Sequence, residues 1–92
     1  MNKYTKIAET LLIHPIGTKL SLPLDGISNT ASSINAVRRG INRELRTAKI
    51  LLGLASMQFT LHVELDPKSD NFQATCLIYL SQPVVPTFTI VS

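Results

Sequence analysis

The sequence contains a single cysteine, Cys76, and no tryptophan. One cysteine cannot form a disulfide within the chain, whereas small domains of oxidising compartments usually carry several. We therefore expect a cytoplasmic protein. Ligands for a metal are scarce as well, because His14, His62 and Cys76 lie far apart and no pair has the spacing of zinc ligands. We expect neither a metal site nor a cofactor.

Long apolar runs are also lacking. The first fifteen residues contain Lys3, Lys6 and Glu9, and their longest apolar run spans only residues 11–13. A signal peptide needs a longer apolar stretch, and a membrane span needs about 20 apolar residues. We expect no signal peptide and no membrane partner.

Catalytic motifs are missing too. The four glycines stand singly along the chain, at Gly17, Gly26, Gly40 and Gly53. No glycine-rich phosphate loop is therefore present. Cys76 falls on the apolar face of a predicted strand, which indicates a small buried residue rather than a nucleophile. Asp66 and Asp70 occupy one predicted loop, where such side chains usually bond the local backbone. We do not expect an enzyme.

Charged residues are few, at 16% of the 92 residues, while 45% are hydrophobic. This composition is far from that of a disordered chain, and the length suffices for one hydrophobic core rather than two. We predict a single domain over residues 1–92. The low charge also suggests that another subunit covers part of the surface, which predicts a homodimer.

Two helices are predicted from apolar residues that recur every three or four positions. The first spans residues 1–15 and ends at Pro15. The second spans residues 30–52, where side chains at its start can cap it and Gly53 ends it. The apolar stripe of this long helix consists of Ile34, Val37, Ile41, Leu45, Ala48 and Leu52.

Strands are predicted where apolar and polar residues alternate. Residues 18–24 form a short strand, and Pro23 favours an edge position because proline has no N–H for a ladder. Residues 58–81 form an antiparallel hairpin, and residues 83–92 form a tail or an edge strand. The sequence therefore predicts an α+β fold. A small three- or four-stranded mixed or antiparallel sheet, with a C-terminal β-hairpin, packs against one long amphipathic helix and a short N-terminal helix.

Two further features suggest close contacts. Leu77 and Tyr79 fall on the outer face of the hairpin, so we expect a helix or a second subunit to cover that face. Among the aromatic residues, we expect only Tyr79 to be available for stacking on single-stranded nucleic acid. Gly40 interrupts the long helix at a cost of about 1 kcal/mol relative to alanine. It predicts a close approach of the sheet, or of another helix in a dimer.

Positive charge is concentrated in the long helix. Residues 30–52 hold five basic residues and one acidic residue, a net charge of +4, whereas the whole chain carries +3. On a helical wheel the polar side chains fill one arc, about 80° to 180° from the apolar stripe. This arc and its borders contain Asn35, Arg38, Arg39, Asn42, Arg43, Arg46 and Lys49.

Like charges in this arc stand three or four residues apart, with no acidic residue to compensate them. Each such pair destabilises an isolated helix by about 0.2–0.5 kcal/mol. Two interpretations follow. An acidic partner binds the arc, or the arc is a solvated surface that Glu64, Asp66 and Asp70 neutralise within the fold.

Arginine and asparagine are the residue types that contact phosphates and base edges in nucleic acids. We therefore hypothesise a small intracellular nucleic-acid-binding or regulatory protein that contacts phosphates through this helix face. The alternative is a protein-binding module or inhibitor, of the kind that viruses and other mobile genetic elements encode. Such a module would bind an acidic protein surface through the same face, or a partner through the apolar tail.

Overall fold

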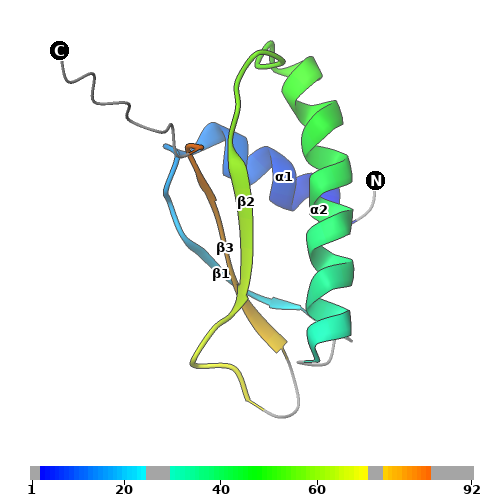
Figure 1. The fold of residues 1–92 in the computed structure, drawn as a ribbon, viewed down its shortest axis with the longest axis vertical. Coiled ribbons are helices and arrows are strands. Elements are labelled where there is room, and N and C mark those ends of the chain that lie inside the picture. The colour runs from blue at the N-terminus through cyan, green and yellow to red at the C-terminus, as the bar shows by residue number, and fades with distance from the viewer. Residues whose placement is uncertain (1–2, 25–29, 71–73, 84–92) are drawn as a thin grey trace, which may run out of the picture.

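The computed structural model of the chain describes residues 3–24, 30–70 and 74–83. Its elements follow in the order α1 (Lys3–Ile13), β1 (Leu20–Leu24), α2 (Ala31–Leu51), β2 (Thr60–Leu65) and β3 (Ala74–Ser81) (Figure 1). The predicted α+β fold is confirmed, with two helices and three strands among the described residues. The tail predicted at 83–92 lies outside this part of the chain from residue 84 onward. The described residues include no helix that is long and apolar enough to cross a membrane.

The central strand of the sheet is β3, with β1 and β2 on its two sides. Both neighbours run antiparallel to β3, so β1 and β2 are parallel to each other and α2 connects them. This is the split βαβ arrangement. The predicted hairpin is confirmed as β2 and β3, and Pro23 lies in an edge strand as expected.

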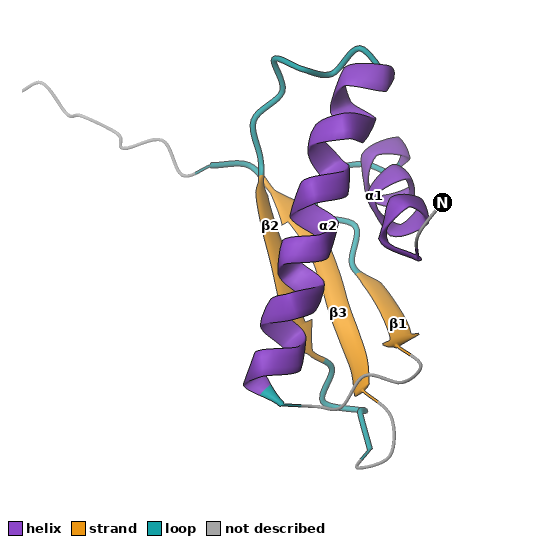
Figure 2. Cartoon of the chain, turned by 90° about the vertical axis from the view of Figure 1, so that its right-hand side faces the viewer, coloured by secondary structure: helices purple, strands orange, loops and turns teal. Residues whose placement is uncertain are grey.

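The hydrophobic core lies between α2 and the sheet, and α1 packs beside α2 on the side of β1 (Figure 2). The buried core residues are Ala8, Leu11, Ile34, Val37, Ile41, Leu45, Ala48, Val63, Cys76, Ile78 and Leu80. Cys76 is fully buried, as predicted, and burial raises the pKa of its thiol. Leu52 is 46% exposed, so its assignment to the apolar stripe is wrong. The reason is that the last turn of α2 extends beyond the strands (Figure 1).

Capping residues fix both ends of α2. Thr30 is the N-cap, and its Oγ1 accepts a hydrogen bond from the backbone N–H of Ser33 at 3.2 Å. At the other end, the N–H of Leu54 donates to the carbonyl of Lys49 at 2.8 Å, which is part of a Schellman motif. Gly53 has a φ of +73°, a conformation that glycine adopts without steric cost.

Gly40 makes a close contact within the chain. A Cβ atom added at Gly40 would lie 2.5 Å from Cδ2 and 2.6 Å from Cε2 of Tyr4 in α1. The expected approach of the sheet at Gly40 is therefore wrong, and a helix crossing in a dimer stays a prediction. Gly40 instead lets the ring of Tyr4 lie against the backbone of α2, which brings α1 close to α2.

Gly40→Ala is expected to destabilise the fold by up to about 2 kcal/mol. Alanine is the better helix former by about 1 kcal/mol, but overpacking against the Tyr4 ring costs about 1–3 kcal/mol. In a Tyr4→Ala background the clash is absent, so the same substitution is expected to stabilise the fold by about 1 kcal/mol. Urea denaturation of the four proteins measures both effects. The same sign in both backgrounds would contradict the Gly40–Tyr4 contact.

Candidate nucleic-acid interface

Four of the seven predicted binding residues lie together on one exposed face of α2. They are Arg39, Asn42, Arg43 and Arg46, which we call the arginine face. Together they line a shallow hollow of about 310 Å³ on the surface of the helix. Among the described residues, none of the three guanidinium groups finds a hydrogen bond or an ion pair.

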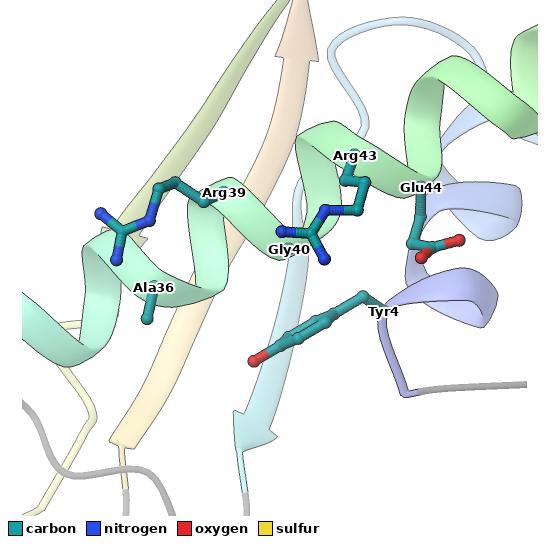
Figure 3. Close-up of a pocket in the computed structure, with 6 residues that line it drawn as sticks. All are labelled: Tyr4, Ala36, Arg39, Gly40, Arg43 and Glu44. Carbon is teal, nitrogen blue, oxygen red and sulfur yellow. The ribbon is translucent and has the colours of Figure 1, made fainter.

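A second hollow adjoins the arginine face on the side of α1. It has a volume of about 260 Å³ and is lined by Tyr4, Ala36, Arg39, Gly40, Arg43 and Glu44 (Figure 3). The lack of a side chain at Gly40 leaves room for the Tyr4 ring, which forms one wall. Tyr4 is not among the binding residues predicted from the sequence. The signal available for it was Gly40, because a glycine in the middle of a helix indicates that another segment approaches there.

Glu44 is the one acidic residue of α2, and it borders the second hollow. Its Oε2 accepts a hydrogen bond from the Oγ1 of Thr5 in α1 at 3.3 Å. Figure 3 shows the Glu44 carboxylate beside α1 and not between Arg39 and Arg43. Glu44 therefore links the two helices, and the arginine face keeps a net positive charge.

Arg38 and Asn35, two further predicted binding residues, make contacts within the fold. Nη2 of Arg38 donates to the carbonyl oxygen of Val63 at 2.9 Å, and Nη1 donates to Oδ1 of Asn35. Val63 lies in β2, an edge strand of the sheet. The guanidinium group therefore joins α2 to β2 and occupies a backbone acceptor that an added strand would use.

Lys49, the last of the seven, is half-buried near the C-terminal end of α2. Its Nζ lies 4.9 Å from the centroid of the Phe59 ring, a cation–π contact. The contact joins α2 to the segment that leads into β2. Lys49 therefore lies beside the arginine face without sharing its full exposure.

The acidic residues expected to neutralise the arc include two that lie on the outer face of the sheet. Successive side chains of a strand point to opposite faces, and Val63 points into the core toward α2. Glu64 and Asp66, one and three positions further on, therefore point to the outer face. Oε1 of Glu64 accepts a hydrogen bond from the Tyr79 hydroxyl at 2.9 Å. The sheet therefore separates Glu64 and Asp66 from the arginine face.

Tyr79 already has partners on this outer face. The His62 ring stacks on it, with the two centroids 4.6 Å apart and an interplanar angle of 10°. Nζ of Lys19 lies 5.1 Å from its centroid, on the side of β1. The expectation that Tyr79 is available for stacking is therefore wrong, because cross-strand neighbours occupy the ring.

Leu77 lies on the same outer face and is half-buried. Its burial does not show whether a second subunit covers this face, so the homodimer stays a prediction.

Asp66 joins the β2–β3 loop to β1. Its Oδ1 accepts a hydrogen bond from the backbone N–H of Lys68 at 3.0 Å, and its Oδ2 accepts one from the Ser21 hydroxyl. These two hydrogen bonds hold the pKa of Asp66 below its ordinary value, and the one from Ser21 has the larger effect. The predicted bonding of this loop aspartate to the local backbone is confirmed.

Asp66 is expected to make the fold less stable in acid. Its pKa is lower in the folded protein than in the unfolded chain, so it stabilises the fold fully above about pH 4. This stabilisation is lost as the pH falls through the folded pKa. Asp66→Asn is expected to lower the free energy of unfolding at neutral pH and to flatten its decline in acid. Urea denaturation over the acid range measures this, and an unchanged pH dependence would contradict the assignment.

The described residues contain no group of three His, Cys, Asp or Glu side chains that could hold a metal ion. Comparison with protein-family models, with curated proteins and with solved structures finds no match to this chain.

Proposed function

We propose that the chain binds nucleic acid through the arginine face of α2. The observation that carries this proposal is the grouping of Arg39, Arg43 and Arg46 on one exposed face, with no hydrogen bond or ion pair from the described residues. Neighbouring arginines repel one another by about 0.2–0.5 kcal/mol for each pair. A phosphate backbone supplies negative charges at short, regular intervals, and its attraction for the guanidinium groups offsets this repulsion.

The dimensions of α2 suit the major groove of a duplex. Because a helix rises about 1.5 Å per residue, Arg39 and Arg46 stand about 10 Å apart along the axis. Figure 1 shows α2 at one side of the molecule, with no other described element outside it. The major groove of B-DNA is about 12 Å wide and admits an α-helix. In this arrangement the arginines contact phosphates, and Asn42, which lines the same hollow, contacts a base edge.

The salt dependence of binding tests this proposal. Fluorescence anisotropy measures the affinity of the full chain for a labelled DNA duplex of mixed sequence between about 50 and 200 mM salt. Three phosphate contacts predict that log affinity falls with log salt concentration with a slope of about −2.7. Arg43→Ala is expected to make this slope shallower by about one unit and to weaken binding to all sequences alike.

Lys68→Ala is the matched control for Arg43→Ala. It also removes one positive charge, but from the loop between β2 and β3, so its slope should equal that of the wild type. If Arg43→Ala kept the wild-type slope, or if the wild type failed to bind DNA at low salt, the proposal would be overturned. A loss of stability in Arg43→Ala would instead indicate that the arginine is held by the fold.

A further inference from the structure

The C-terminal end of α2 presents apolar side chains to solvent. Ile50, Leu51 and Leu52 are 69%, 77% and 46% exposed. Single exposed apolar residues are ordinary, but three in succession are unusual for a soluble protein. Successive helix positions point about 100° apart, so these side chains surround the helix end, and Ile50 is the one that lines a hollow. The last turn of α2 extends beyond the strands (Figure 1), so the sheet does not cover these side chains.

A hollow of about 250 Å³ lies on one side of this helix end. Its lining consists of Arg46, Lys49, Ile50 and Ala55. The Schellman motif at Gly53 turns the chain back at the end of α2. In the turn that follows, the N–H of Met57 donates to the carbonyl of Leu54 at 2.9 Å, which fixes the segment that carries Ala55. Two apolar side chains and two cations therefore meet at one hollow.

The charges around this hollow are all positive. Arg46 is exposed, and the contact with Phe59 positions the ammonium group of Lys49. Between Glu44 and Glu64 the chain contains no aspartate or glutamate. A ligand that complements the hollow therefore combines an apolar group with negative charge.

Two other occupants fit this chemistry less well. In a symmetric contact with a second copy, this surface would meet the same surface of that copy, so both sides would carry Arg46 and Lys49, and like charges disfavour such an interface. The three exposed side chains also offer only a few hundred Å², below the roughly 800 Å² per partner of a standard interface. Nucleic acid supplies the negative charge but no large aliphatic group.

We propose that this end of α2 is a docking site for a short acidic peptide segment of a partner protein. One large apolar side chain of the peptide enters the hollow against Ile50 and Ala55, and neighbouring carboxylates pair with Arg46 and Lys49. The site shares only Arg46 with the arginine face. It does not depend on the binding of nucleic acid.

Selection from a library of short random peptides, displayed on phage and panned against the full chain, tests this docking site. The enriched peptides are expected to carry aspartate or glutamate beside a large aliphatic or aromatic residue. The most enriched peptide is then labelled, and fluorescence anisotropy measures its affinity. Ile50→Ser is expected to weaken this affinity at least about tenfold, as for a central interface residue. Arg39→Ala, which removes a charge from the arginine face alone, should leave it unchanged.

Several results would overturn this proposal. They are a failure to enrich peptides, enrichment of peptides without acidic residues, and equal affinity of Ile50→Ser and the wild type.

Three other results would assign this end of α2 to a different role. A dimer that Ile50→Ser dissociates in light scattering would assign it to contact with a second copy. Binding to phosphatidylserine vesicles that Ile50→Ser abolishes would assign it to a membrane surface. A lower urea midpoint for Ile50→Ser would assign it to packing within the chain. DNA binding is tested by Arg43→Ala and peptide binding by Ile50→Ser, so the two proposals fail independently.

Discussion

Leu45→Ala is expected to lower the free energy of unfolding by about 2–5 kcal/mol. Leu45 is 2% exposed and belongs to the core between α2 and the sheet. Its truncation removes buried apolar surface and leaves a cavity in a closely packed interior. The total stability of such a domain is about 5–15 kcal/mol, so this single change removes a large part of it.

Leu51→Ala on the same helix is the matched control for Leu45→Ala. The chemical change is the same, but Leu51 is 77% exposed. Its substitution is therefore expected to change the free energy of unfolding by no more than about 0.5 kcal/mol. Urea denaturation followed by circular dichroism measures both variants. Similar losses for the two would contradict the assignment of the buried face of α2.

Replacing Arg39, Arg43 and Arg46 together with glutamine is expected to reduce the affinity for duplex DNA roughly 10³-fold at about 50 mM salt. The release of counterions from three phosphates makes the affinity vary with about the −2.7 power of the salt concentration in mol/L. This contribution is absent at about 1 M salt and reaches roughly 10³-fold at about 50 mM. The wild-type affinity should therefore fall about 40-fold between 50 and 200 mM salt, while that of the variant stays nearly constant. Folding stability is expected to hold or to rise slightly, because like-charge pairs disappear.

A variant with Lys6, Lys19 and Lys68 replaced by glutamine controls for net charge. It also loses three positive charges, but from outside α2, so the salt dependence of its DNA affinity should match that of the wild type. Anisotropy titrations of the two triple variants distinguish binding at the arginine face from a general effect of net charge on DNA affinity. Equal losses of affinity in both would show that the arginine face has no special role.

Most of the local structure could be predicted from the sequence. The stripe from Ile34 to Ala48, with Thr30 before it and Gly53 after it, located α2 because periodicity and capping are local properties. The order of the strands could not be derived in this way. It depends on pairs far apart in the chain, such as Leu20 with Ile78, which no local pattern specifies. Leu52 was misplaced because its spacing continues the stripe past the point where the sheet ends.

The helical wheel located the arginine face correctly on exposed positions of α2. It could not show that Arg38 bonds Val63 or that Lys49 lies over Phe59, because both contacts depend on how β2 packs against α2. Ile50 falls within the polar arc of the same wheel. That apolar residue among the arginines was the available signal for the exposed end of α2.

The backbone amide chemical shifts of the isotope-labelled protein, recorded by NMR as duplex DNA is added, test the central claim most directly. The largest changes are expected at residues 39–46 of α2, and high salt should remove them. Smaller changes are expected on the outer face of the sheet, around His62 and Tyr79. Largest changes on that outer face, or none at residues 39–46, would contradict the claim that α2 carries the nucleic-acid interface.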